Sequence, residues 1–214
     1  MNLKPVVFAF SLLACATAGA HSTGEHAGHA EPARHSETSQ VAFVDQPLLD
    51  QDGRSVDLRR DLVGERIVVM GFVYTSCTTV CPLVSSIMGK LQARLGDQVG
   101  REVSLVSISV DPQRDTPQRL LDYSRRYHAG PGWRWLTGEP VAVDDTLKAL
   151  GAWSADYESH PPLIMVGDGR SDRWTRFYGF TDPAVLQAKV AELQAARASA
   201  EHDHAGHLAA EVRP

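Results

Sequence analysis

The feature that most limits the fold of this chain is an uninterrupted apolar run at residues 67–73, Ile-Val-Val-Met-Gly-Phe-Val. A half-exposed strand alternates polar and apolar side chains, whereas a continuous apolar run is typical of a strand buried on both faces. A helix is predicted next, over residues 82–95, because apolar side chains recur at helical spacing and Gly96 ends the pattern. A buried strand followed by a helix predicts an α/β fold.

The rest of the central region continues this alternation. An extended segment with a turn at Asp52-Gly53 is predicted over residues 41–58. Later strands are predicted at 104–110, 163–166 and 174–178, and later helices at 116–127, 141–150 and from Pro183 onward. The pattern predicts one α/β domain over residues 41–198, with a central mixed sheet flanked by helices and an extended or hairpin addition at its N-terminus.

The two ends of the chain differ from this domain. Residues 21–40 and 199–214 are rich in His, Ala and Glu and lack apolar periodicity, which predicts a flexible His-rich linker and a flexible His-rich tail. Residues 1–20 are typical of a cleaved export signal: Lys4, a short apolar run and Ala18-Gly19-Ala20. An alternative is a lipoprotein signal ending before Cys15, which would become a membrane anchor. Both interpretations predict a periplasmic protein.

The formal net charge of −5 argues against nucleic acid as a partner, because it provides no basic field. Cys77 and Cys81 are the candidate working residues, since they follow the buried strand and open the helix. Ligands bind at that edge of α/β sheets, and a helix N-terminus favours thiolate. Two thiolates at this spacing can hold a soft metal such as Cu(I) or zinc, or join as a redox-active disulfide; an inert disulfide is the structural alternative.

His160 is a candidate third ligand, because it lies on a loop just before the predicted strand 163–166. A histidine in a loop is also common as a simple surface residue. The tails add further imidazoles, which either bind metal weakly or are incidental to solubilising linkers. These histidines are His21, His26, His29 and His35 in the N-terminal segment and His202, His204 and His207 in the C-terminal one.

Four blocks together resemble the Sco/SenC family of copper proteins, which have a thioredoxin-like fold. They are residues 72–82 (Phe-Val-Tyr-Thr-Ser-Cys-Thr-Thr-Val-Cys-Pro), residues 106–117 (Val-Ser-Ile-Ser-Val-Asp-Pro-Gln-Arg-Asp-Thr-Pro), residues 132–138, and His160 with its following strand. They occur in the family's order and cover nearly the whole domain. Many family members have other residues around the first cysteine and an acidic residue where this chain has Ser159, so the resemblance indicates a divergent branch.

The resemblance implies that Cys77, Cys81 and His160 bind copper, as Cu(I) or Cu(II). It also implies that Asp111 supports the metal loop or contacts a partner, although an Asp before Pro112 is equally typical of a turn. Asp115 is expected to cap the helix that follows it. Pro162 occupies the place of the cis-proline of thioredoxin-like folds, so a cis bond before Pro162 is expected.

Three functions are compatible with these residues. The first is a metallochaperone, which is not an enzyme and delivers copper to an extracytoplasmic cuproenzyme such as the binuclear centre of cytochrome c oxidase. The second is a thiol–disulfide oxidoreductase that reduces the copper-ligand cysteines of that client. The third is a metal buffer acting through the His-rich tails. The expected partners are the client and a periplasmic copper donor or thiol reductant.

Overall fold

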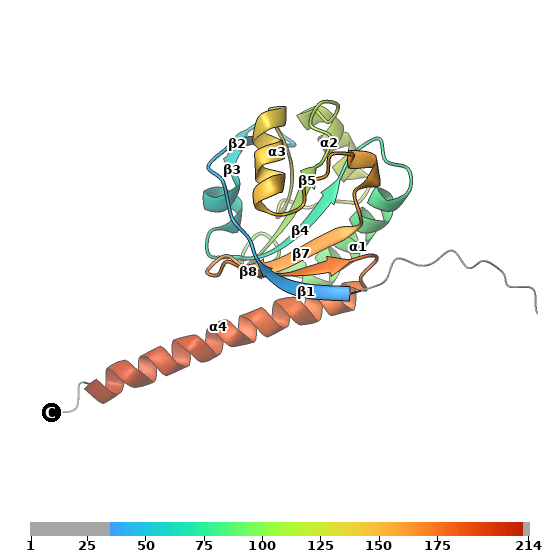
Figure 1. Cartoon of the computed structure of the whole chain (residues 1–214). Helices are drawn as coiled ribbons and strands as arrows, with labels where there is room; N and C mark the ends of the chain where they lie inside the picture. Colours follow the sequence, from blue (N-terminus) through green and yellow to red (C-terminus); the bar gives the residue numbers. More distant parts are fainter. Residues whose placement is uncertain (1–34, 212–214) are drawn as a thin grey trace, which may run out of the picture. The chain divides into compact units, whose positions relative to one another are not determined.

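The computed structural model describes the backbone of residues 35–211 and the side chains of residues 35–202, all within one compact unit. Its centre is a mixed sheet in the order β1-β8-β7-β4-β5-β6-β2-β3 (Figure 1). The strands are β1 (His35–Gln40), β2 (Pro47–Asp50), β3 (Ser55–Asp57), β4 (Ile67–Val73), β5 (Val103–Ser109), β6 (Trp133–Thr137), β7 (Leu163–Asp168) and β8 (Arg173–Tyr178).

Strands β4, β5 and β6 are parallel to one another, and the other pairings are antiparallel. Every residue of β4 and β5 is buried, as the apolar run in β4 predicts. The predicted α/β class with a central mixed sheet is confirmed. The predicted N-terminal addition is the antiparallel hairpin of β2 and β3, which continues the sheet beyond β6.

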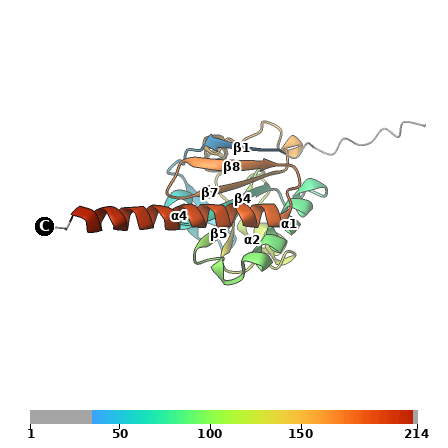
Figure 2. The same cartoon turned by 90° about the horizontal axis from the view of Figure 1, so that it is seen from below.

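Helices cover both faces of the sheet. Helix α1 (Val80–Leu95), α2 (Pro117–Arg125) and α4 (Pro183–Glu211) pack on one face (Figure 2). Met88, Leu120 and Leu186 are fully buried there. Helix α3 (Pro140–Ala149) and the π-helical turn η1 (Leu58–Val63) pack on the other. Short 3-10 turns are η2 (Gly96–Gln98) and η3 (Tyr157–Ser159).

The domain begins before residue 41, where its start was expected. Strand β1 lies inside the expected linker and pairs with β8 from His35↔Tyr178 to Gln40↔Arg173. Nearly all of its side chains are exposed, so it lacks the alternation that marks a half-buried strand. Polar contacts attach it instead: Tyr178 Oη donates to Glu37 Oε1 at 2.8 Å, and the Thr38 and Thr175 hydroxyls lie 3.1 Å apart.

Helix α4 continues to Glu211, so it runs past residue 198, where the domain was expected to end. Residues 199–211 contain several alanines with glutamate and leucine. These residues favour a helix by their own propensity. They lack the apolar periodicity from which a helix is predicted. The export signal, Cys15, His21, His26 and His29 lie outside the described residues, and so do the side chains of His204 and His207.

Candidate functional site

Cys77 and Cys81 lie where β4 passes into α1. Cys77 sits in the connecting loop, and its N–H donates to the Tyr74 carbonyl at 3.2 Å. Helix α1 begins at Val80 rather than at the predicted Pro82, so Cys81 lies in its first turn. Both side chains are buried, and both cysteines are free thiols. The two sulfurs therefore lie inside the protein, close to the carboxyl end of β4.

The sulfur of Cys77 interacts directly with the start of α1. Its Sγ accepts a hydrogen bond of 3.3 Å from the backbone N–H of Cys81, while Thr79, the residue before the helix, makes no capping bond with its side chain. The Thr79 hydroxyl lies 3.8 Å from the same sulfur. Free N–H groups at a helix start favour negative charge. The loop thus stabilises a thiolate at Cys77.

The two thiols differ in acidity. Burial opposes ionisation of Cys77, but hydrogen bonds from Cys81, Thr79 and Tyr74 outweigh it and lower the pKa of Cys77 to about 7. Burial raises the pKa of Cys81, and the hydrogen bond with Cys77 and the charge of Asp115 raise it further. Near neutral pH, Cys77 is therefore the nucleophilic thiolate and Cys81 the protonated partner.

His160 follows η3 and is buried, with 9% of its side chain exposed. Its Nε2 lies 3.1 Å from the Ala152 carbonyl oxygen, and its ring centroid lies 5.9 Å from that of Phe72. Burial lowers the pKa of His160 against the opposing effect of the carbonyls of Ala152 and Pro161. The imidazole is neutral at pH 7, which is the form that binds metals.

Cys81 and His160 line the same small cavity, beside Pro161 and Pro162. The cavity has a volume of about 10 Å³, which is the order of space that one water molecule needs. Within residues 35–202, no three side chains of His, Cys, Asp or Glu are grouped closely enough to hold a metal ion as they stand. Cys77 and Cys81 supply two soft donors, whereas His160 must leave the Ala152 carbonyl before it can join them.

The expectation of a cis peptide bond before Pro162 is wrong, because the described backbone contains no cis bond. Pro162 nevertheless faces the cysteine loop, since it shares the cavity with Cys81. The position of a proline in sequence predicts that proximity through the fold. It does not determine the isomer, which depends on the local loop.

Asp111 is buried, and its carboxylate bonds an arginine of its own loop. Its carboxylate accepts from Arg114 Nη1 at 3.1 Å, and the same nitrogen donates to Tyr157 Oη at 2.7 Å. Tyr157 begins η3, the turn directly before His160, and its ring lies edge-on to Tyr74 with centroids 5.1 Å apart. Asp111 therefore supports the loop that carries His160. Arg114, Tyr157 and Tyr74 had no recognisable signal in the sequence, because their link joins separate loops.

Asp115 does not cap α2. The side chain of Thr116 does so, by accepting from the N–H of Arg119 at 3.3 Å. The carboxylate of Asp115 instead points into the core and bonds Thr75 and Ser109. The expectation of a cap is wrong by one residue, since both Asp and Thr are good caps and spacing alone does not choose between them.

Two tail histidines fall within the described side chains. The His35 ring stacks on the Tyr178 ring with centroids 4.6 Å apart, and His202 is exposed on α4. Neither belongs to a group of three metal donors among the described side chains. No helix within residues 35–211 is long and apolar enough to cross a membrane.

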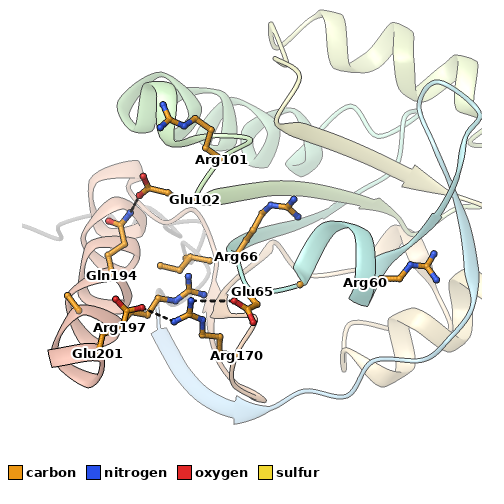
Figure 3. A pocket seen from close by; sticks show the side chains of 12 residues that line it. Arg60, Glu65, Arg66, Arg101, Glu102, Arg170, Gln194, Arg197 and Glu201 are labelled. Atoms are coloured by element: carbon orange, nitrogen blue, oxygen red, sulfur yellow. Dashed lines mark hydrogen bonds and ion pairs between the residues drawn. The ribbon is translucent and has the colours of Figure 1, made fainter. Parts of the chain in front are cut away.

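A larger pocket, of about 680 Å³, is lined by Ile67, which begins β4 and so lies at the far end of that strand from the cysteines. Figure 3 shows the charged side chains that line it. Five arginines line it: Arg60, Arg66, Arg101, Arg170 and Arg197. Five carboxylates line or pair with this cluster: Glu65, Glu102, Glu201, Asp61 and Asp168. Ion pairs of Arg197 with Asp168 and of Arg170 with Glu201 join α4 to the end of β7 and the turn that follows it.

The family model described as SCO1/SenC matches residues 36–193. The protein SenC of Rhodobacter capsulatus is 30% identical over 163 residues, which cover 75% of this chain and 70% of that protein. The SCO1 protein homolog of Bacillus subtilis is 36% identical over 90 residues, 42% of this chain. That match spans only 45% of the Bacillus protein's own length.

Solved structures show the same fold. The copper-bound ScoI of Bradyrhizobium japonicum superposes with a TM-score of 0.59 at 25% identity, covering 71% of this chain and 98% of that one. BsSco, described as a member of the Sco family of cytochrome c oxidase assembly proteins with a disulfide switch, gives a TM-score of 0.61 at 22% identity, covering 73% and 95%. The expected thioredoxin-like fold is thereby confirmed.

Proposed function

The chain belongs to the SCO1/SenC family, and on that premise we propose that it is a copper metallochaperone acting outside the cytoplasm. Its client is an extracytoplasmic cuproenzyme, and the binuclear copper centre of cytochrome c oxidase is the site it serves. The domain is exported by residues 1–20, with lipidation of Cys15 as the alternative route to a membrane surface. Copper is the cargo of this chain.

The observation that carries the proposal is the arrangement of three donors around one sheet edge. The Cys77 sulfur contacts the N–H of Cys81, and Cys81 shares a cavity with His160. Two thiolates suit Cu(I), and an added imidazole suits Cu(II) as well. The copper-bound ScoI of Bradyrhizobium japonicum, a relative in fold, supports the choice of metal.

In this proposal the residues divide the work. Cys77 ionises near neutral pH and takes the metal first. The charge of the bound metal then lowers the pKa of Cys81, so that Cys81 also loses its proton and binds as thiolate. His160 turns from the Ala152 carbonyl toward the same cavity and completes the set. Delivery reverses these steps by exchange with the client's ligands: the bonds from copper to sulfur and nitrogen pass to the client, and Cys81 takes up a proton again.

A copper titration tests this. The reduced chain is titrated with Cu(I) against a chelator strong enough to strip isolated imidazoles, so that the tail histidines do not score. We expect one equivalent in the parent and none in Cys77→Ala or Cys81→Ala. With Cu(II), His160→Ala should bind at least about tenfold more weakly, the loss of one ligand interaction. No retained copper in the parent, or equal Cu(II) affinity in His160→Ala, contradicts the proposal.

The unequal acidity of the two thiols supports a second candidate, a thiol–disulfide oxidoreductase. The Cys77 thiolate would attack a client disulfide, and one client sulfur would leave as thiolate. Cys81 would then attack Cys77, closing the Cys77–Cys81 disulfide and releasing the second client thiol with the Cys81 proton. Two electrons pass to the client, and an external thiol reductant restores the pair.

His160 separates the two candidates. A reductase needs both thiols but no imidazole ligand. His160→Ala should therefore retain reduction of a model disulfide while it loses Cu(II) affinity. If disulfide reduction by the parent is no faster than by Cys77→Ala, the oxidoreductase candidate fails and the chaperone remains.

A further inference from the structure

Asp115 carries a carboxylate in the core that the metal or thiol chemistry does not use directly. Its side chain is 1% exposed. The backbone around it is fixed at both ends, because its N–H donates to the Asp111 carbonyl at 2.9 Å and its carbonyl accepts from the Thr137 hydroxyl at 2.7 Å. A buried carboxylate is costly unless it is fully hydrogen-bonded, so its partners show what it holds.

Those partners connect two loops at the sheet edge. Oδ1 of Asp115 accepts from the Thr75 hydroxyl at 2.5 Å, and Oδ2 accepts from the Ser109 hydroxyl at 2.6 Å. The backbone N–H of Thr75 is shared between both oxygens at 3.2 and 3.1 Å. Ser109 ends β5, whereas Thr75 lies in the loop that follows β4. Burial raises the pKa of Asp115, and the hydrogen bonds from Ser109 and Thr75 oppose that rise because they stabilise the ionised carboxylate.

Thr75 stands two residues before Cys77, and its neighbour Tyr74 accepts the Cys77 N–H. Fixing Thr75 therefore fixes the point from which the chain turns to place the Cys77 sulfur against the first N–H groups of α1. We infer that Asp115 is a positioning residue for the thiol pair: it anchors the cysteine loop through Thr75. This inference rests on the proposed use of Cys77 and Cys81, whether for copper or for electrons.

The two acidic residues of the β5–α2 connection thus divide the site. Asp115 holds the cysteine loop, and Asp111 holds the His160 loop through Arg114 and Tyr157. A metal or redox site requires its side chains to be held within a fraction of an ångström by surrounding contacts. The carboxylate of Asp115 supplies that restraint on the sulfur side.

The test measures alkylation of Cys77 by iodoacetamide at about pH 7 in the reduced chain, where the rate follows the thiolate fraction. Asp115→Asn and Thr75→Val both weaken the anchor. We expect each to slow Cys77 alkylation about tenfold, as the sulfur loses its place at the start of α1. Thr75→Ser keeps the hydroxyl and should restore the parent rate to within about twofold.

The direction of the change separates positioning from simple charge. Removing a negative charge near a thiol should by itself favour thiolate and speed alkylation. A faster or unchanged rate in Asp115→Asn, or a parent-like rate in Thr75→Val, overturns the inference. If Asp115→Asn does not fold, the pair Thr75→Val and Thr75→Ser decides, since Thr75 is only half-buried.

A matched control removes another buried carboxylate. Asp50 accepts the N–H groups of Asp52 and Arg54 in the β2–β3 turn, away from the cysteines. Asp50→Asn should lower the melting temperature without changing the Cys77 rate. A second readout is the Cu(II)–thiolate absorption band, which Asp115→Asn should shift or weaken. If the parent binds no copper, the proposed function fails, while the alkylation rates still decide the role of Asp115.

Discussion

The backbone N–H of Cys81 donates a 3.3 Å hydrogen bond to the Sγ of Cys77, so the sulfur of one cysteine caps the helix that carries the other. A side-chain acceptor in that position normally belongs to Ser, Thr, Asp or Asn. Here the acceptor is a thiol that gains stability by ionising. The same contact contributes to the lowered pKa of Cys77, whereas burial is the main reason that the pKa of Cys81 is raised and that its thiol remains protonated.

The first prediction concerns the order of thiol reactivity. Cys77 should be alkylated with a midpoint near its pKa of about 7, whereas Cys81 should react only at much higher pH. Brief labelling at a series of pH values, followed by peptide mapping, measures both. Labelling of Cys81 before Cys77 at neutral pH would show that the assignment of the nucleophile is wrong.

The same shift predicts how stability changes with pH. The pKa of Cys77 is lowered on folding from 9.0 to about 7, so folding favours its thiolate. Its contribution is present above about pH 9 and is lost as the pH falls through 7. The free energy of unfolding of the reduced chain should therefore rise between pH 7 and 9. Urea titrations should show a smaller rise in Cys77→Ser, and an equal rise in both chains counts against the shift.

His160 predicts a second change of stability with pH, because it is a base that burial keeps neutral. Burial lowers its pKa, so the folded state keeps the imidazole neutral while the unfolded chain takes up a proton below about pH 6.5. The free energy of unfolding should fall as the pH drops below that value. His160→Gln can still donate to the Ala152 carbonyl but does not titrate. Urea titrations near pH 5 and pH 7 should show a smaller fall in the free energy of unfolding for His160→Gln than for the parent. Identical falls in both chains would show that His160 does not cause the loss of stability at low pH.

Much of the sheet edge was predictable from local pattern. The continuous apolar run of β4 determines a strand buried on both faces, and the helical spacing after Cys81 determines α1. Together they place the thiols at a strand-to-helix junction. Strand β6 was missed because the predicted elements left residues 133–137 unassigned, although Trp133 and Trp135 are fully buried in it.

Contacts between loops were not predictable in the same way. Asp111 and Asp115 lie four residues apart in one loop, yet one bonds Arg114 and the other Thr75. Nothing in their spacing distinguishes them, because the direction of each side chain depends on how the β5–α2 loop packs against the β4–α1 loop. The orientation of His160 toward Ala152 depends similarly on the course of a whole loop.

Tyr157 tests the support of the His160 loop. Tyr157→Phe removes the hydroxyl that accepts from Arg114 and keeps the ring against Tyr74. Amide hydrogen exchange in residues 152–160 should become faster, while the free energy of unfolding should fall by at most about 1 kcal/mol. Tyr178→Phe is the control, since its hydroxyl bonds Glu37 in β1. Unchanged exchange in Tyr157→Phe would show that the hydrogen bond from Arg114 to the Tyr157 hydroxyl does not hold the loop.

Arg176 tests how β8 supports the end of α3 next to the His160 loop. This guanidinium is buried, and its acceptors among the described residues are all neutral: the Leu150 carbonyl at 2.6 Å, the Gly151 carbonyl at 3.2 Å, the Ser39 hydroxyl at 2.7 Å and the Met165 sulfur at 3.8 Å. Arg176→Met keeps most of the side chain's volume but leaves the carbonyls that end α3 without a donor. The free energy of unfolding should fall by about 2–4 kcal/mol, measured by urea denaturation.

Arg173 provides the matched substitution on the same strand, because its side chain is exposed. Arg173→Met should change the free energy of unfolding by no more than about 0.5 kcal/mol. The loop from Ala152 to His160 starts where Arg176 holds Gly151, so the Arg176 variant should also speed amide exchange at Ala152 and weaken Cu(II) binding. A loss of stability equal to that of Arg173→Met would mean that water replaces the guanidinium, and that Arg176 does not support the His160 loop.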